Sequence, residues 1–294
     1  MANAPKPTTV KKESSSTASN LFATLVIPIC ILIGVALFIF VLGKPSNFNI
    51  PADVAKANSS ASLAFYDADT HSFLPLQGNY GGMAYKGGFI VPILMGMLLM
   101  VFVFSIERLI VIGKATGKGS LDSFVKKIQS LLSAGNIAAA SAECDKQEGS
   151  VANVIKSGLK KYGEMETEQN MDTDQKCLAI QKDIEEATSL EMPMLEQNLT
   201  IIATLVSVGT LMGLLGTVTG MIKAFGGLAN SGAPDQAALA TGISEALINT
   251  ATGIGTSTLA IIMYNILTSK IDKLTYAIDE AGFSIIQTYA STHK

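Results

Sequence analysis

Cysteine and histidine are scarce in this chain of 294 residues, which has three cysteines and two histidines. The cysteines, Cys30, Cys144 and Cys177, show no Cys-X-X-Cys spacing, so we expect neither a disulfide framework nor a zinc site. The sequence shows no cluster of histidines and carboxylates that could hold a catalytic metal. We therefore expect no cofactor.

Charged residues are also scarce, at 15% of the chain against 48% hydrophobic residues, and the mean hydropathy is +0.38. This composition is too apolar for an ordinary soluble domain and indicates a membrane protein in contact with the lipid bilayer. The net charge of −3 gives no excess of positive charge of the kind that binds nucleic acid, so no nucleic-acid partner is expected.

Four apolar runs approach or exceed the roughly 20 residues that a helix needs to cross about 30 Å of hydrocarbon. The runs 21–42, 88–106 and 197–222 contain no Asp, Glu, Lys or Arg, and the run 237–268 contains only Glu245. We predict an all-α integral membrane protein with four transmembrane helices. A cleaved signal peptide is the alternative for the first run, but its apolar stretch exceeds the about 7–15 residues of such a peptide.

The distribution of lysines and arginines predicts the orientation of the chain in the membrane, because cytoplasmic loops carry more of these residues than loops on the other side. Seventeen of the 21 fall in the two tails and the long middle connection, so both termini are predicted to be cytoplasmic. The predicted segments are a disordered cytoplasmic tail (1–20), an extra N-terminal transmembrane anchor (21–42), a periplasmic loop (43–87), a transmembrane helix (88–112), a cytoplasmic helical domain (113–196), a transmembrane helix (197–227), a periplasmic turn (228–236), a transmembrane helix (237–268) and a cytoplasmic helical tail (269–294).

Apolar residues at helical spacing predict that the cytoplasmic section is helical throughout. An amphipathic helix should begin at Leu121 and end near Gly135, and a second should end at Gly163. A third should begin after Asp172 and reach the next span with only Pro193 to interrupt it. The pattern continues beyond the fourth span, which predicts one long helix in a cytoplasmic bundle or stalk.

Five aromatic residues of the 43–87 loop lie close to the membrane entry. We expect them at the lipid interface, and contact with a partner is the alternative. They are Phe65, Tyr66, Phe73, Tyr80 and Tyr85.

The third span carries glycines at GxxxG spacing, which lets helix backbones approach closely in lipid. The predicted helix-packing residues are Gly209, Gly213, Gly216 and Gly220. In the fourth span, a turn of 100° per residue places a polar stripe on one face, facing protein or water. The stripe consists of Thr241, Glu245, Asn249, Thr252 and Thr256, with Thr250, Gly253 and Ser257 beside it.

Glu245 would cost at least a few kcal/mol as an unpaired charge in hydrocarbon. It must therefore lie near the outer interface, be hydrogen-bonded, or be protonated. A role in ion transfer and a structural tie, for example to Lys223, are both open from the residues alone.

Two strings carry a resemblance to a known family. The stretch ATLVSVGTLMGLLGTVTGMIKAF and the following GISEALINTATGIGTSTLAIIMYN resemble the core of the ExbB/TolQ/MotA proton-channel family, and SIERL at 105–109 resembles the sequence at the inner end of the preceding span. The similarity covers 88–280 and is nearest to ExbB and TolQ. The anchor and the 43–87 loop are additions to the family's usual three-span plan.

The resemblance implies a non-enzymatic subunit of a homo-oligomeric, typically pentameric, ring in a bacterial inner membrane. The ring would surround a dimeric ExbD-like single-span partner, whose aspartate would supply the carboxylate for proton flow. A TonB-like third component would pass the motion to the outer membrane. The coupling ion would be H⁺, with Na⁺ as the alternative.

By motif, Thr217 and Thr250 match threonines that line the family's lumen, and Glu245 matches its polar-stripe glutamate. We include Asn249 and Thr252 in the predicted ion path. The chain departs from the family at Gly209-Thr210, where Ala-Pro is common, and at Leu259, where proline is often found.

The resemblance predicts a motor for TonB-dependent transport, and a TolQ-like or MotA-like stator for envelope maintenance or motility is the alternative. A self-sufficient transporter or a passive scaffold is a third reading. Such a transporter would need its own midplane charge or broken helices, and neither is visible in the sequence.

Overall fold

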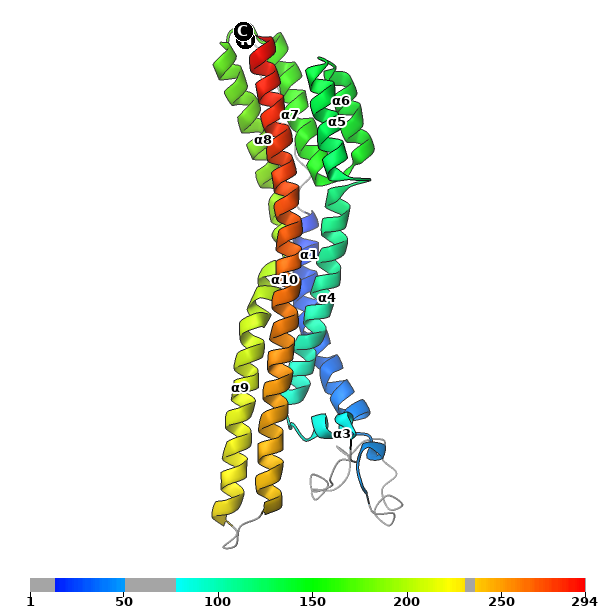
Figure 1. Ribbon diagram of the computed structural model, residues 1–294, viewed down its shortest axis with the longest axis vertical. Helices are drawn as coiled ribbons and strands as arrows, with labels where there is room; N and C mark the ends of the chain where they lie inside the picture. Colours follow the sequence, from blue (N-terminus) through cyan, green and yellow to red (C-terminus); the bar gives the residue numbers. More distant parts are fainter. Residues whose placement is uncertain (1–13, 51–77, 231–235, 294) are drawn as a thin grey trace, which may run out of the picture. The chain divides into compact units, whose positions relative to one another are not determined.

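In the computed structural model, residues 14–50, 78–230 and 236–293 are described (Figure 1), and these contain helices and turns but no strand. The helices are α1 (Ser14–Leu37), the π-helical η1 (Phe38–Leu42), the 3-10 helix η2 (Pro45–Asn47), α3 (Tyr80–Tyr85), α4 (Ile90–Thr116), α5 (Leu121–Ser133), α6 (Ile137–Gln147), α7 (Gly149–Thr167), α8 (Thr173–Glu196), α9 (Leu199–Asn230) and α10 (Gln236–Thr292). Within these described ranges, four helical stretches are long and apolar enough to cross a membrane. The predicted all-α fold with four spans is confirmed.

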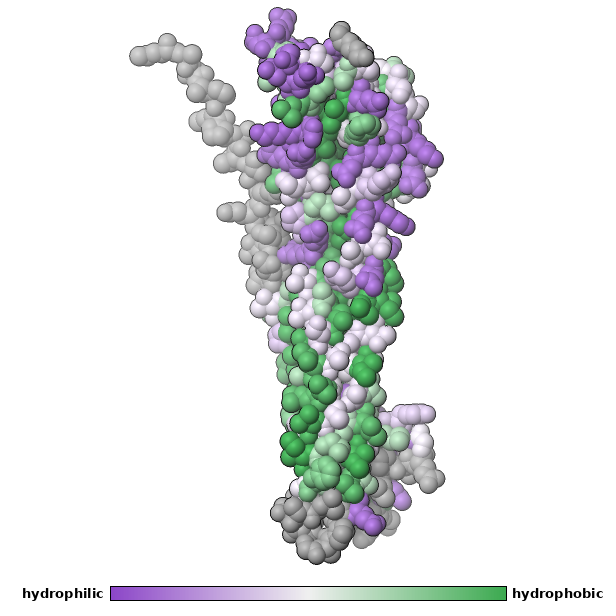
Figure 2. All heavy atoms as spheres, turned by 60° about the vertical axis from the view of Figure 1, so that its left-hand side comes forward, coloured by the Kyte–Doolittle hydropathy of each residue, from purple (hydrophilic) through white to green (hydrophobic). Residues whose placement is uncertain are grey.

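The chain forms two compact units. The apolar unit comprises Met1–Phe102 and Thr204–Ala260, and the polar unit comprises Val103–Ala203 and Ile261–Lys294. Helices α4, α9 and α10 contribute residues to both. On the face shown in Figure 2, hydrophobic residues cover most of α9 and α10 in the apolar unit, whereas hydrophilic residues are concentrated on the polar unit.

Within the apolar unit, α1 packs directly on α4 through two glycines. A Cβ atom built on Gly34 would lie 2.6 Å from the backbone nitrogen of Gly96, and one built on Gly96 would lie 2.8 Å from the Cα of Ile31. In lipid there is no hydrophobic driving force between helices, so helices associate through dispersion contacts. Small residues at a crossing permit these contacts because they let the backbones approach closely. The first span is therefore packed on the second, although this part of α1 lies outside the predicted family core.

The two described tyrosines of the 43–87 loop have different surroundings. Tyr80 is 84% exposed, whereas Tyr85 is 7% exposed and stacks on Phe38 with ring centroids 4.6 Å apart. Phe48 meets Tyr85 edge-on at 5.6 Å. Tyr85 therefore belongs to a small aromatic core with the end of the first span, and this corrects the expectation that it would lie at the lipid interface. Phe65, Tyr66 and Phe73 lie outside the described residues.

Helix α1 begins at Ser14, so Ser14–Asn20 is helical and was wrongly assigned to a disordered tail. Serine and threonine are weak helix formers, but a helix already nucleated by an apolar span can extend through them, because nucleation is the costly step. Residues 1–13 lie outside the described residues.

In the polar unit, α5 to α8 pack in sequence beside the C-terminal part of α10 (Figure 1). Helix α5 ends where expected, with Gly135 at φ +69° and Asn136 capping α6 through its side chain. Helix α6 agrees with the prediction that this section is helical throughout, but its own bounds were not predicted, because its run of alanines gives a weak apolar stripe. Helix α7 continues through Gly163 to Thr167, so the predicted stop there is wrong. One glycine costs a helix only about 1 kcal/mol, which packing offsets.

Helix α8 begins after Asp172, which forms a capping box with Gln175. Pro193 lies inside the helix, and the interruption falls later, where Asn198 adopts φ +64°. Arg108 of α4, 2% exposed, holds this break because its guanidinium donates to the carbonyl of Met194 at 2.9 Å. The prediction that Pro193 itself interrupts the helix is therefore corrected.

Helix α10 is one unbroken helix from Gln236 to Thr292, as the continued pattern predicted. Its C-terminal part buries apolar side chains against the other helices of the polar unit. The buried residues are Ile271, Leu274, Ile278, Ile285 and Tyr289.

Candidate ion path between α9 and α10

Helices α9 and α10 of the apolar unit touch through their backbones, and four glycines of α9 face α10. A Cβ on Gly220 would lie 2.8 Å from the Ala246 nitrogen, and one on Gly213 would lie 3.1 Å from the Cα of Gly253. A Cβ on Gly209 would lie 2.6 Å from the Ser257 Oγ atom, and one on Gly216 would lie 2.2 Å from the Asn249 Cβ atom. The structure therefore places all four predicted packing glycines at one helix crossing.

This close approach brings Thr217 and Thr250 together. Their hydroxyl oxygens are in hydrogen-bonding contact, and both side chains are partly buried. Each hydroxyl also bonds within its own helix, Thr217 to the Gly213 carbonyl at 3.2 Å and Thr250 to the Ala246 carbonyl at 3.1 Å. Because a hydroxyl both donates and accepts, this pair can reorient around a proton or a neighbouring carboxylate.

A second hydroxyl pair lies seven residues away on each helix, towards the N-terminus of α9 and the C-terminus of α10. Thr210 donates to Ser257 at 2.9 Å, and Ser257 is 7% exposed. We call Thr210, Thr217, Thr250 and Ser257 the hydroxyl ladder. Sequence reasoning did not combine these four residues into a site, although the seven-residue spacing on both helices was a readable signal.

The other predicted path residues lie elsewhere on α10. The Glu245 carboxylate accepts from Lys223 at 2.6 Å, and its side chain is 6% exposed. Asn249, fully buried, donates to the Gly87 carbonyl at 2.9 Å, and Thr252 bonds to the Ile248 carbonyl of its own helix. The structure brings Thr217 and Thr250 together and places Glu245 and Asn249 against the connection between α3 and α4.

The chain supplies little charge or metal-binding chemistry to this region. Glu245 is the only acid in the apolar runs of α9 and α10. Within the described ranges, no three His, Cys, Asp or Glu side chains gather in a way that could hold a metal ion. A carboxylate at the hydroxyl ladder would therefore have to come from another molecule.

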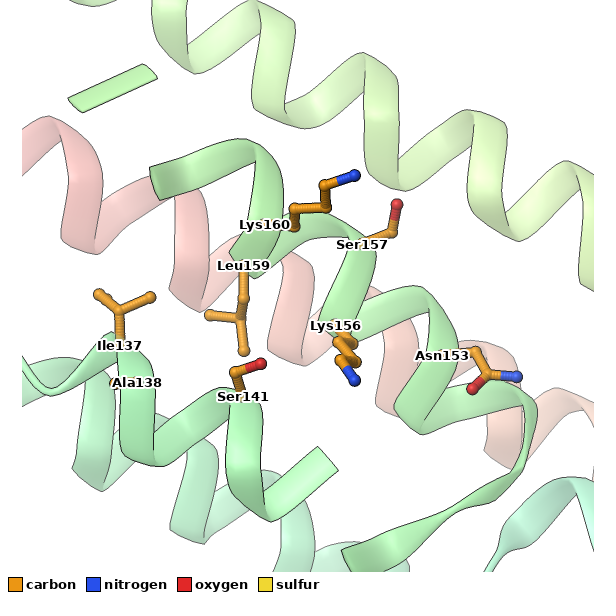
Figure 3. Close-up of a pocket in the computed structure, with 8 residues that line it drawn as sticks. All are labelled: Ile137, Ala138, Ser141, Asn153, Lys156, Ser157, Leu159 and Lys160. Carbon is orange, nitrogen blue, oxygen red and sulfur yellow. The ribbon is translucent and has the colours of Figure 1, made fainter. Parts of the chain in front are cut away.

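The polar unit has a hollow of about 600 Å³ between α6 and α7 (Figure 3). Ile137 and Leu159 line it, and two of its polar side chains are engaged, because Lys156 pairs with Asp145 and Ser157 donates to Asp183. Burial raises the pKa of the nearby Cys144 thiol to about 12, so this cysteine is protonated and unreactive at neutral pH. We assign no chemistry to this hollow.

Apolar helices long enough to span a membrane, with hydroxyl groups paired between two of them, place this chain among integral membrane proteins. Comparison with known proteins names the family: residues 146–280 match the MotA/TolQ/ExbB proton channel family. This range includes the hydroxyl ladder and every predicted site residue. The segment matches that family, which comprises proton channels rather than enzymes, and the predicted resemblance is confirmed.

Individual relatives agree with this assignment. The chain is 29% identical over 157 residues to the Tol-Pal system protein TolQ of Pseudomonas aeruginosa, covering 53% of this chain and 68% of that protein. It is 35% identical over 88 residues to TolQ of Haemophilus influenzae, covering 30% and 39%. It is 31% identical over 86 residues to the biopolymer transport protein ExbB of Pseudomonas putida, covering 29% and 26%.

Proposed function

We propose that this chain is an inner-membrane motor subunit that forms a pentameric ring around an ExbD-like dimer. The ring converts proton motive force into mechanical work for TonB-dependent transport across the outer membrane. Both termini lie in the cytoplasm, as the excess of lysine and arginine in the tails and the middle connection favours.

The observation that carries this proposal is the contact between the Thr217 and Thr250 hydroxyls at the crossing of two apolar helices. Hydroxyls in hydrocarbon usually bond back to their own helix, and these two also bond to each other. Such a pair is neutral, so it can solvate a proton or orient a carboxylate but cannot hold a charge by itself. An aspartate from the single-span partner would complete the path.

The exposed surface of α9 supports a ring. Leu211, Leu214 and Ile222 are 62%, 58% and 66% exposed. A helix whose inner face carries the glycines and whose outer face carries large apolar side chains is suited to contact lipid or a neighbouring subunit. Protons, or Na⁺ in the alternative, are the coupling ion, and no bound cofactor is proposed.

The double variant Thr217→Val with Thr250→Val tests the proposal. Valine keeps the volume and removes both hydroxyls, so the ring should assemble while energised uptake and proton flow into membrane vesicles are lost. The matched control is Thr258→Val, because the Thr258 hydroxyl is exposed and bonds only to the Ile254 carbonyl. Full proton flow in the double variant would refute the assignment.

A TolQ-like role in envelope maintenance is the second candidate, and the relative from Pseudomonas aeruginosa favours it because it aligns over 53% of this chain. A MotA-like stator for motility is the third. The discriminating observation is the third component: a TonB-like protein indicates uptake, and a partner with a peptidoglycan-binding domain indicates a stator.

A further inference from the structure

The connection between α3 and α4 is fastened to α10 by contacts that the proposed ion path does not use. Asn249 donates to the Gly87 carbonyl at 2.9 Å, in a fully buried position. Gly88, with φ +73°, lies so close to Glu245 that a Cβ atom there would be 2.2 Å from the Glu245 Oε1 atom. Glu245 and Asn249 are one helical turn apart, so both side chains face the same two glycines.

Lys223 of α9 completes this arrangement. Its Nζ atom lies 2.6 Å from the Glu245 Oε1 atom and 6.0 Å from the centre of the Phe89 ring, next to Gly88. The Lys223 side chain is 53% exposed, whereas that of Glu245 is 6% exposed. A carboxylate so far removed from water needs a close cation or hydrogen-bond donors, and the Lys223 ammonium group lies in contact with it.

We propose that Glu245 is a positioning residue in a lock that joins α9, α10 and the α3–α4 connection. The loop lock consists of Gly87, Gly88, Lys223, Glu245 and Asn249. It fixes the rotation of α10, and therefore the direction of Thr250, while ions pass along the hydroxyl ladder. This inference rests on the proposed function, and it removes Glu245 and Asn249 from the predicted ion path.

The geometry favours a lock over an ion carrier for two reasons. Five residues separate Glu245 from Thr250, so their side chains point about 140° apart around the helix. The Glu245 carboxylate is also committed to Lys223, and protonating it would remove the negative charge that holds the lysine. The Asn249 side chain is an amide, which neither takes up nor releases a proton near neutral pH, so it cannot serve as a step in a proton relay.

The test compares Lys223→Gln, Glu245→Gln and the double variant, each in membranes of cells that also make the native partners. Two readouts are used: hydrogen exchange of the amides of residues 80–89, and proton uptake into right-side-out membrane vesicles. Each single variant should speed exchange roughly three- to tenfold and lower proton uptake to a similar extent. The double variant should be no worse than either single variant, because one interaction is lost in all three.

The charge-swapped variant Lys223→Glu with Glu245→Lys should restore slow exchange. The lock is wrong if Glu245→Gln abolishes proton uptake while Lys223→Gln leaves it intact, or if exchange changes in neither. The test of the lock can fail while the proposed function holds, and the proposed function can fail while the lock holds. The Thr217→Val and Thr250→Val double variant should lose proton flow, while hydrogen exchange at residues 80–89 stays unchanged. The exchange measurement tests the lock even if the native protein shows no proton flow.

Discussion

At the scale of single residues, the small size of glycine decides how close α9 and α10 can come. Gly253 of α10 lies against Gly209 and Gly213 of α9, and a Cβ atom on it would be 2.7 Å from the Gly209 carbonyl oxygen. That atom belongs to backbone, which cannot move aside without shifting a helix. The contact between the Thr217 and Thr250 hydroxyls depends on this approach.

Gly253→Ala should therefore separate the two helices and destabilise the protein by about 1–3 kcal/mol. The matched control is Gly255→Ala, since a Cβ atom on Gly255 would meet nothing within 4 Å. Alanine there should be neutral or slightly stabilising, because it favours the helix. Thermal unfolding of the two variants in detergent, followed by circular dichroism, measures the difference, and equal midpoints would contradict this account of the crossing.

At the scale of elements, the break between α8 and α9 depends on a charged pair from a different helix. Arg108 of α4 is buried, pairs with the adjacent Glu107, and donates to the Met194 carbonyl in the last turn of α8. The last carbonyls of a helix have no partner within it, so a buried end needs a donor from elsewhere. Asn198, in the left-handed conformation, then lets α9 begin in a new direction.

Arg108→Gln should destabilise the polar unit by about 3 kcal/mol, because it leaves Glu107 and the α8 carbonyls without their donor. Lys118→Gln is the control. It removes a lysine whose side chain is 70% exposed in its pair with Glu148, and such pairs contribute about 0–1 kcal/mol. Chemical unfolding of both variants compares the two losses in free energy of unfolding. An Arg108→Gln variant as stable as the control would exclude this role of Arg108.

Helix ends show where sequence reasoning was sufficient and where it failed. Asp172 and Asn136 begin helices through their own side chains, and the first of these starts was predicted from a local signal. Gly163 and Pro193 are local signals for an end, yet both lie inside helices. Their cost is small enough for packing to offset, and the actual break at Asn198 is held by a residue ninety positions earlier in the chain.

At the scale of the whole molecule, the described parts of α9 and α10 place hydroxyls but no acid at their hydroxyl ladder, which fits the proposal that another chain supplies the carboxylate. The family match supports a proton channel, and the exposed apolar side chains of α9 leave a surface for neighbours. Helix α1, which lies outside the segment that matches the family, covers part of α4 through Gly34 and Gly96. That face of α4 is consequently unavailable to a neighbouring subunit.

Purification from native membranes should therefore yield a complex of five copies of this chain with two copies of a single-span protein. Native mass spectrometry gives the stoichiometry, and peptide sequencing identifies the partner and any third component. If the complex contains no single-span protein with an aspartate in its span, the proposed source of the carboxylate is wrong. A chain that purifies as a monomer and moves a solute without a partner would establish a self-sufficient transporter instead.

The sequence by itself determined the four spans, the helical polar section and the family, because hydrophobic length, helical period and motif spacing are local properties. It also pointed to Thr217 and Thr250, through their motifs. Only the tertiary structure decided that these hydroxyls meet at a glycine crossing, and that Glu245 faces Lys223 and Gly88 instead. The period of a helix says which residues share a face, but the partner of that face is set by packing between residues far apart in the chain.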